Sequence, residues 1–421
     1  MLQVFTNSWA LFVGMFMLMV GNGLQGTLLG LRGEVEGFST LSLSIVMSAY
    51  FLGFLFSSRY TPQLIRRVGH VRVFAALGSM VSAVLISYPV LVDPWAWSVG
   101  RVIIGFCFCG LYITAESWLN DASSNENRGK SLSLYMIVQM AGIVFAQWIV
   151  TTGDISGYVL FIIPSILVSL AFAPVLLSVK PMPAFEATKP MKIRDLIEAS
   201  PLACVGMFML GGVFSAQFGM SAVYGSRVGL SVAEVSFFVS SIYISALVLQ
   251  YPIGWISDRM DRRVLIIWVS LLGAAGSMIA FLLPGSFVLI VVSGAIVGGT
   301  SNPLYALLIA YANDYLERED MAAASAGLLF INGVGAIMGP LTVGLMMDVI
   351  GNNGFWLFTG LLMFAVGAWG IYRSTQRSRS DLDIEEQVPY ALVSAASTSV
   401  AAELAQEAYT YEEEQLTNDP S

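Results

Sequence analysis

Twelve stretches of mainly apolar residues, each long enough to cross a lipid bilayer as a helix, run through this chain of 421 residues. A helix needs about 20 apolar residues to span the hydrocarbon core. The composition agrees, because 56% of the residues are hydrophobic, only 11% are charged, and the mean hydropathy is +0.75. The stretches are 8–31, 42–62, 71–92, 95–117, 131–152, 157–179, 203–226, 233–255, 264–284, 286–312, 322–348 and 353–373. The sequence therefore predicts an all-α integral membrane protein with 12 transmembrane helices.

Basic residues are distributed unevenly between the two sides of the predicted bundle. Of the 20 Lys and Arg residues, 17 fall in the connections after even-numbered stretches or after the last one. The other three are Arg32 and Arg227, each at the end of a stretch, and Arg101 inside one. Because basic loops stay in the cytoplasm, we expect a multi-pass protein of the cytoplasmic membrane with both termini cytoplasmic.

The chain also repeats itself. The pattern Leu111-Tyr112, seven residues, Asn120-Asp121 recurs 193 positions later as Leu304-Tyr305, seven residues, Asn313-Asp314. This offset predicts a six-helix half over 1–180 and a second over 201–375. A Pro-rich polar segment at 181–200 has the composition of a cytoplasmic linker. Parallel repeats of this kind place a binding site between the halves near the middle of the membrane.

Several motifs resemble those of a known family. The loop Gly254-Trp-Ile-Ser-Asp258-Arg259-Met-Asp261-Arg262-Arg263 resembles the major facilitator signature G-x-x-x-D-R-x-G-R-R, with Asp261 in place of the last glycine. Arg101-Val-Ile-Ile-Gly105 resembles the R-x-x-x-G element of that superfamily. Further segments, among them Ala115–Asn120 and Gly333–Pro340, are similar to its YcaD-like branch.

The resemblance implies the major facilitator fold and a mechanism of alternating access. We expect a secondary active transporter that moves a small organic solute across the cytoplasmic membrane, coupled to protons. The alternative is a non-transporting sensor or assembly factor of the same fold. Arg66, which stands where the first-half signature loop would have its acidic residue, favours that alternative. The expected partners are a small-molecule substrate, protons and the lipid bilayer; we expect no nucleic acid, and a monomer.

Candidate substrate contacts come from stretches 1, 4, 7 and 10, which line the cavity in this architecture. They are Asn22, Gln25, Thr27, Arg101, Tyr112, Gln217, Tyr224, Asn302 and Tyr305. Gln139, Gln147 and Asn332, on stretches 5 and 11, are second candidates. Buried amides need hydrogen-bond partners, so the alternative role for each is a hydrogen bond between helices.

Three ionisable residues are the candidates for proton coupling: Arg101, Glu116 and Asp314. A cation at the centre of a membrane helix costs roughly 2.5–3.5 kcal/mol on insertion scales, and such residues are usually functional. The alternative roles are a structural pair for Arg101, helix packing for Glu116 and an interfacial group for Asp314. The only histidine, His70, falls in a basic loop, so we expect carboxylates to carry any coupling.

The signature loop supplies candidate gating residues. Gly254, Asp258, Arg259, Arg262 and Arg263 are closely spaced at the cytoplasmic end of stretch 8. Asp258 could form ion pairs that hold the two halves closed and break when the cavity opens. Alternatively, the arginines only determine topology.

The segment 376–421 is an acidic tail. Residues 381–421 hold ten acidic residues and no basic one, which leaves the rest of the chain slightly basic. Such a composition predicts a disordered cytoplasmic segment. Since the tail has no apolar span to pack, we expect its removal to leave transport intact, unless it docks on the body.

No catalytic or cofactor motif is present. The chain has no nucleotide-binding glycine loop or metal-ligand motif, and its three cysteines lie in apolar stretches. We therefore expect no enzyme activity, no cofactor and no bound metal.

Overall fold

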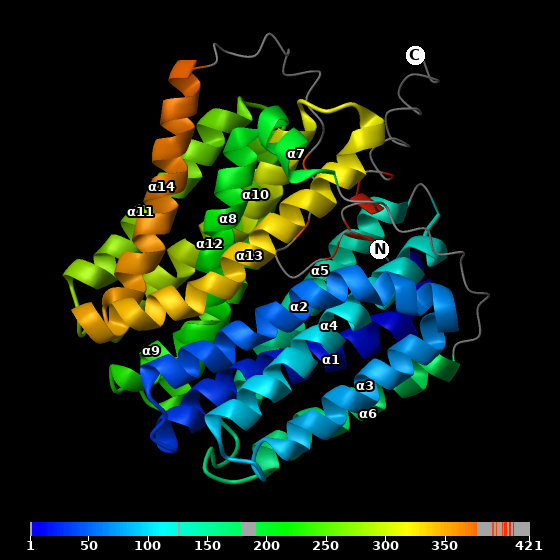
Figure 1. Cartoon of the computed structure of the whole chain (residues 1–421), viewed down its shortest axis with the longest axis vertical. Helices are drawn as coiled ribbons and strands as arrows, with labels where there is room; N and C mark the ends of the chain where they lie inside the picture. The colour runs from blue at the N-terminus through cyan, green and yellow to red at the C-terminus, as the bar shows by residue number, and fades with distance from the viewer. Residues whose placement is uncertain are drawn as a thin grey trace.

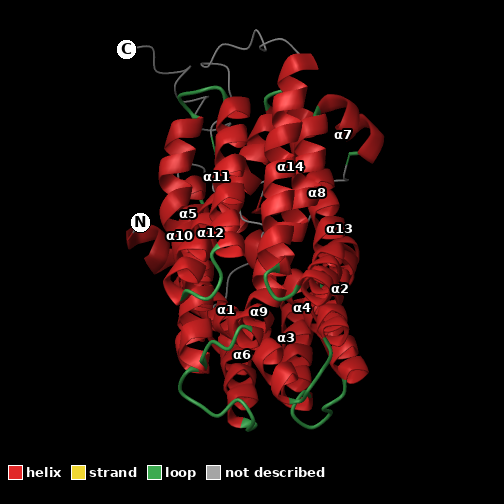
Figure 2. Ribbon diagram, turned by 90° about the vertical axis from the view of Figure 1, so that its left-hand side faces the viewer, coloured by secondary structure: helices red, strands yellow, loops and turns green. Residues whose placement is uncertain are grey.

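The computed structural model describes residues 2–124, 127–177 and 191–376 and, of the tail, residues 390, 393, 398, 400, 401, 404, 405 and 407. The regular elements in these residues are all helices (Figure 2). The first six are α1 (Leu2–Val35), α2 (Thr40–Val68), α3 (His70–Ser87), α4 (Pro94–Ala122), α5 (Arg128–Val150) and α6 (Val159–Leu177). They are followed by α7 (Ile193–Ala199), α8 (Pro201–Ser215), the π-helical η2 (Ala216–Met220), α9 (Ser221–Arg227), α10 (Val232–Ser257), α11 (Arg262–Leu282), α12 (Phe287–Asn313), α13 (Arg318–Ile350) and α14 (Gly354–Gln376).

The twelve apolar stretches coincide with helices to within a few residues. In the described part of the chain, eleven helical segments are long and apolar enough to cross a membrane. The stretch at 157–179 corresponds to a shorter apolar helix, Val159–Val175. The prediction of an all-helical, multi-pass membrane protein is therefore confirmed.

Helix starts follow from local capping chemistry. Asp93 caps α4 by accepting hydrogen bonds from the backbone nitrogens of Trp95 and Ala96, both at 2.9 Å. Ser231 and Glu234 form a reciprocal capping box at the start of α10. Both arrangements satisfy backbone donors that the first helical turn leaves free.

The seventh stretch is not a uniform helix. It consists of α8, η2 and α9, with the π-helical turn at Ala216–Met220. Single π-helical turns interrupt regular helices and are frequent at functional sites. Here the turn carries Gln217 and Phe218, and Phe218 packs against Gly26 of α1.

Helices α1–α6 pack mainly among themselves, and so do α8–α14. We call these sets the first group and the second group. The connections α2–α3, α4–α5, α10–α11 and α12–α13 share one end of the bundle, which we call the basic end. Eight arginines lie in these connections or in the helix ends beside them: Arg66, Arg67, Arg72, Arg128, Arg259, Arg262, Arg263 and Arg318. In Figure 1 the groups lie close together near α9 and diverge toward the side where the red segments of the tail lie.

The opposite end is closed by contacts between the groups. Arg227 of α9 pairs with Glu34 of α1 at 2.7 Å, donates to Thr40 of α2 at 2.5 Å, and lies 3.6 Å from Asp348 of α13. Thr40 also donates a hydrogen bond to Asp348. One guanidinium therefore connects four helices from both groups.

The predicted linker 181–200 is described only in its second part, since 181–190 lie outside the described residues. The short helix α7 occupies Ile193–Ala199. Just before it, the Met191 backbone nitrogen donates to the Ala323 carbonyl of α13 at 2.9 Å, which attaches the linker to the second group.

Candidate functional site

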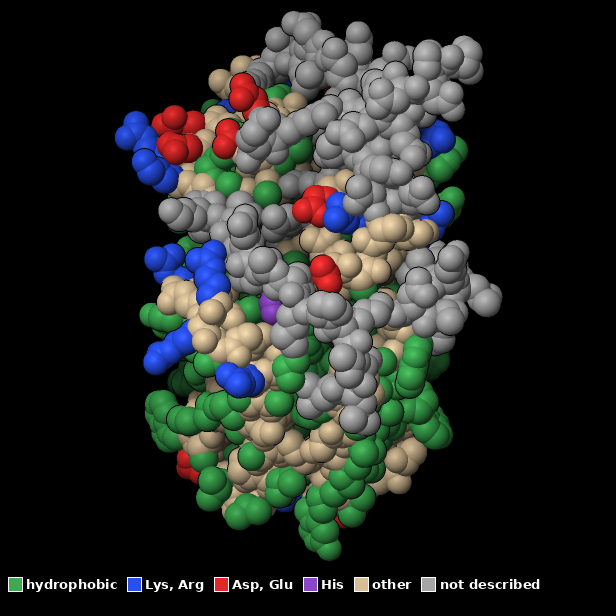
Figure 3. Space-filling view, turned by 90° about the vertical axis from the view of Figure 1, so that its right-hand side faces the viewer, with side chains coloured by type: hydrophobic (Ala, Val, Ile, Leu, Met, Phe, Trp, Pro, Cys, Tyr) green, Lys and Arg blue, Asp and Glu red, His purple; other side chains and the backbone are tan. Residues whose placement is uncertain are grey.

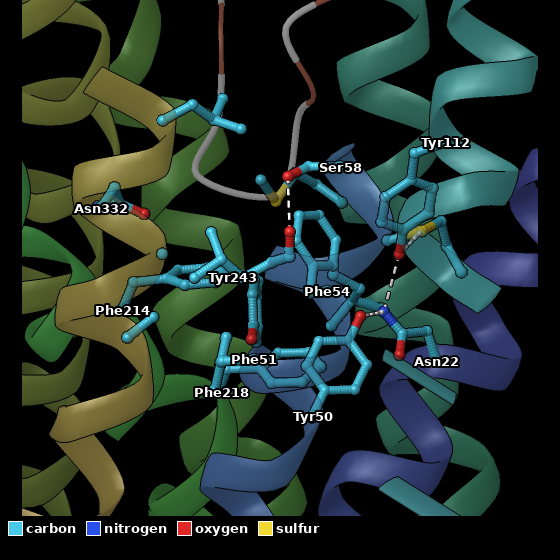
Figure 4. Close-up of a pocket in the computed structure, with 17 residues that line it drawn as sticks. Asn22, Tyr50, Phe51, Phe54, Ser58, Tyr112, Phe214, Phe218, Tyr243 and Asn332 are labelled. Atoms are coloured by element: carbon cyan, nitrogen blue, oxygen red, sulfur yellow. Dashed lines mark hydrogen bonds between the residues drawn. The ribbon is translucent and has the colours of Figure 1, made fainter. Parts of the chain in front are cut away.

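A pocket lies between the two groups, and both contribute to its walls (Figure 4). It contains about 730 Å³ of atom-free space, part of which is open to solvent. The lining residues are Met19, Asn22, Tyr50, Phe51, Phe54, Leu55, Ser58, Tyr112, Met140 and Ile143 of the first group, and Phe214, Phe218, Tyr243, Leu329, Asn332, Gly333 and Ala336 of the second.

The polar wall of the pocket centres on Asn22. Its Nδ2 donates to the Tyr112 hydroxyl at 2.8 Å and to the Tyr50 hydroxyl at 3.3 Å. Gln25 Nε2 donates to Asn22 Oδ1 at 3.0 Å. Both polar atoms of the Asn22 amide are therefore hydrogen-bonded, and the hydroxyl oxygens of Tyr50 and Tyr112 are held at the pocket surface.

Arg101 lies behind this wall and does not line the pocket. It is fully buried, and its Nη1 donates to Gln25 Oε1 at 2.8 Å. Its guanidinium carbon lies 4.6 Å from the centroid of the Tyr50 ring, within the range of a cation–π interaction. Among the described residues, no carboxylate lies within ion-pairing distance of Arg101. The cation is therefore linked to the pocket through Gln25 and Asn22.

Among the described residues, the side chains that line the pocket are neutral. Seven of them are aromatic, two are asparagines, and the set includes no Asp, Glu, Lys, Arg or His. Phe214 and Phe218 stack with ring centroids 6.0 Å apart, and Phe51 meets both at steep angles. These rings offer flat apolar faces to a ligand.

Glu116 lies on α4 four residues beyond Tyr112, about 6 Å toward the basic end. Its side chain is 1% exposed and accepts a hydrogen bond from the Tyr135 hydroxyl at 3.3 Å. Thr398 of the tail donates to the same carboxylate through its backbone nitrogen and its hydroxyl. The proton-coupling candidate is therefore a buried carboxylate one helical turn from the pocket.

The expected loop position of His70 is wrong. Gly69 adopts a positive φ of 85°, which permits a tight turn, so that α3 begins directly at His70. The imidazole is 2% exposed, and its Nε2 lies 3.0 Å from the Ser117 hydroxyl. A buried imidazole thus contacts the residue next to Glu116.

The signature loop forms an ion-pair cluster centred on Arg262. Its guanidinium lies 2.5 Å from Asp314 and 3.5 Å from Asp258, and it donates to the Ser257 hydroxyl at 3.0 Å. All these residues belong to the second group, so these pairs join α10, α11 and α12. Arg259 instead lies over the Trp255 ring, 4.3 Å from its centroid.

Asp314 is therefore engaged with Arg262, away from the pocket. Arg263 donates to the Tyr315 hydroxyl at 3.3 Å. Gly254 faces the tail, because a Cβ placed on it would lie 2.5 Å from the Tyr390 ring. The gating role of the five loop residues remains a prediction.

Of the nine candidate substrate contacts, Asn22 and Tyr112 line the pocket. Gln25 and Arg101 support Asn22 from behind. Thr27 donates to Gln147 at 3.0 Å, and Gln217 donates to Ser301 at 3.1 Å, so both pairs link helices within a group. The remaining three, Tyr224, Asn302 and Tyr305, are buried but do not line the pocket.

The aromatic wall on α2, α8, η2 and α10 was not predicted from the sequence. Tyr50, Phe51 and Phe54 repeat at helical spacing, as do Phe214 and Phe218. The spacing places each set on one helix face, but an aromatic stripe in a membrane helix can equally face lipid. Asn332, a second candidate, does line the pocket.

Comparison with known proteins agrees with the all-helical membrane fold. The family described as Major Facilitator Superfamily matches residues 11–226 and 202–408. The uncharacterized MFS-type transporter YcaD of Salmonella arizonae is 24% identical over 362 residues, which cover 84% of this chain and 92% of that protein.

Two solved structures share the fold. The nucleoside transporter NupG superimposes with a TM-score of 0.70 at 15% identity, covering 87% of this chain and 98% of that one. A bacterial homologue of the human lysosomal transporter Spinster, in an inward-facing and unoccupied conformation, gives a TM-score of 0.65 at 15% identity over 99% of both chains. At these identities the likeness concerns the fold alone.

Proposed function

The chain belongs to the major facilitator superfamily of transporters, and from that premise we propose that it transports a neutral, ring-containing organic solute coupled to protons. The observation that carries this proposal is the pocket between the two groups. Its aromatic faces, two amides and phenol hydroxyls can stack on a ring and hydrogen-bond its polar substituents. A charged solute would enter this wall without an opposite charge to meet it, at a desolvation cost. The presence of a pocket between the two groups favours a transporter over a non-transporting sensor or assembly factor.

Proton coupling is assigned to Glu116. A carboxylate buried in a membrane helix, one turn from the pocket, can exchange a proton when the adjacent path opens. Tyr112 on the same helix face contacts Asn22, which provides a short route by which solute binding can influence Glu116.

Alternating access requires two bodies that move relative to each other. We assign them to 1–180 and 201–375, joined by the linker 181–200. The ion-paired contacts at the opposite end would open when the basic end closes. They would form again when the basic end opens. By the charge rule the basic end faces the cytoplasm, so both termini are cytoplasmic and the protein lies in the cytoplasmic membrane.

A ligand screen tests the substrate class. Purified protein is heated in the presence of neutral heterocycles, sugars and glycosides, and of anionic and cationic solutes of similar size. A ligand at 100 times its Kd stabilises the native state by roughly 2.7 kcal/mol. We expect stabilisation by a neutral ring compound, lost in Asn22→Ala and retained in Ser277→Ala, whose hydroxyl lies near Thr359 away from the pocket.

Stabilisation by charged solutes only would contradict the substrate class. Equal binding by Asn22→Ala would contradict the assignment of the pocket.

A further inference from the structure

The acidic tail is attached to both groups at the basic end. Its described residues contact α4 and α5 of the first group and α10 of the second. Several are buried despite lying near the end of the chain: Val393, Thr398, Ala401, Leu404 and Ala405. The prediction of disorder concerns 376–421, most of which lies outside the described residues.

The attachment to the first group uses Glu116. Thr398 is 1% exposed, and its backbone nitrogen lies 3.3 Å and 3.4 Å from the two carboxylate oxygens. Its hydroxyl donates to Oε2 of the same carboxylate. A second contact is the ion pair between Glu407 and Arg128 at the start of α5, at 2.9 Å. The tail thus covers the proposed coupling residue and donates to both of its oxygens.

The attachment to the second group uses the signature loop. The backbone nitrogen of Tyr390 donates to Asp258 Oδ1 at 2.8 Å. The Tyr390 ring lies against Gly254, where a side chain would collide with it. Burial, with a further contribution from the Asp258 carboxylate, raises the pKa of the Tyr390 phenol above its ordinary value, so the ring is neutral at physiological pH.

The tail lies on the path from the pocket to the basic end. On α4, Glu116 follows the pocket residue Tyr112 by four positions; on α10, Gln250 and Gly254 follow the pocket residue Tyr243 by seven and eleven. These spacings keep each set on one helix face. Thr398 and Tyr390 therefore cover the continuation of two helix faces that line the pocket.

We infer that the C-terminal tail is an autoinhibitory plug, which closes the path between the solute pocket and the basic end and withholds Glu116 from proton exchange. The inference rests on the proposed transport function, because a plug inhibits only if solute and protons use that path. Arg227 joins the groups at the opposite end, and the docked tail covers the path at the basic end. Figure 3 shows one face of the molecule, on which most charged side chains gather in the upper part, above a largely hydrophobic lower part.

This inference reverses the expectation that removal of the tail would leave transport unchanged. A docked plug must leave before solute can pass, so its release should raise the transport rate. Tail and body also carry opposite charge at one contact, Glu407 with Arg128.

Accessibility of a pocket cysteine tests the plug without any substrate. Met140 lines the pocket on α5 and is buried. Met140→Cys is introduced into protein in which Cys107, Cys109 and Cys204 are replaced by Ala. In inside-out vesicles, a membrane-impermeant methanethiosulfonate then reports access from the basic end. We expect labelling to be slow with the native tail and several-fold faster with Tyr390→Ala and Thr398→Ala together.

A cross-link supplies the converse measurement. The Tyr390 ring lies against the Cα of Gly254, so Gly254→Cys with Tyr390→Cys should form a disulfide on oxidation. With the tail locked, labelling at position 140, counted by peptide mass spectrometry, should fall further and recover on reduction. The control Ser374→Cys, on an exposed position of α14, should be labelled equally in every background and only in inside-out vesicles.

Labelling at position 140 that responds to neither the tail variants nor the lock would overturn the plug. Accelerated labelling in a protein that binds no solute would keep the plug as a closure of this path and refute the transport proposal instead. The two failures are therefore distinguishable.

Discussion

Arg101 shows how a single buried cation can organise a binding surface that it does not touch. Its guanidinium donates to Gln25, Gln25 donates to Asn22, and Asn22 donates to two pocket tyrosines. A planar guanidinium can bond Gln25 while lying over the Tyr50 ring. We therefore regard Arg101 as a positioning residue for the pocket amide.

Replacement of Arg101 by Lys tests this role. Lys keeps the charge but loses the planar group, so we expect ligand affinity to fall by roughly 10- to 100-fold, since a hydrogen bond to a charged group contributes about 1.5–3 kcal/mol. If the effect passes through Gln25, then Gln25→Ala and Arg101→Lys should be non-additive in ligand titrations. Additive losses, or a loss of thermal stability with unchanged affinity, would assign Arg101 to packing alone.

Individual residues could be predicted from the sequence only in part. Asn22 and Tyr112 were identifiable because a polar group in an apolar helix costs free energy unless it has a hydrogen-bond partner. Tyr224 and Tyr305 met the same criterion, yet neither lines the pocket, and Tyr224 stacks on Phe355 within the second group. Which face of a helix meets the pocket depends on helix rotation, and a single polar residue does not determine that.

At the scale of helices, the close approach of α2 and α13 determines which end of the bundle is closed. A Cβ placed on Gly344 would lie 1.9 Å from the Ser44 hydroxyl. Ser48 donates to the Ile337 carbonyl at 2.5 Å. Small residues thus allow the two groups to meet at the opposite end.

A larger side chain at this contact should open that end. We expect Gly344→Val to force α2 and α13 apart and to shift the population toward the conformation open at the opposite end. In right-side-out vesicles, Met140→Cys should then be labelled several-fold faster. The matched control is Leu345→Val at the neighbouring position, which is exposed. Unchanged labelling in a folded Gly344→Val protein would show that this contact is not part of the closure.

The helices themselves could be predicted because hydropathy and length alone define a membrane span. Pairing across the groups could not, since it depends on small residues and on Arg227, whose acidic partners Glu34 and Asp348 lie far apart in the sequence. Docking of the tail could not be predicted from its acidic composition, because the few described residues that dock are buried against helices of both groups.

At the scale of the whole molecule, the two closures act on one pocket. Arg227 joins the groups at the opposite end, and the tail joins them at the basic end. Glu116 contacts the tail and lies one turn from the pocket, so we propose that solute, proton and tail all act on α4. In this account, transport requires the tail to leave Glu116 before the carboxylate can change protonation.

Transport driven by an imposed pH gradient, compared between wild type and Glu116→Gln, tests the central claim most directly. The measurement uses proteoliposomes and the solute found in the ligand screen. The account predicts that wild type accumulates or expels solute with the gradient and stops with a protonophore. Glu116→Gln should still bind solute and exchange it across the membrane, but should not respond to the gradient, because an amide keeps the shape without cycling a proton. Gradient-driven transport by Glu116→Gln with an unchanged pH dependence would contradict the account.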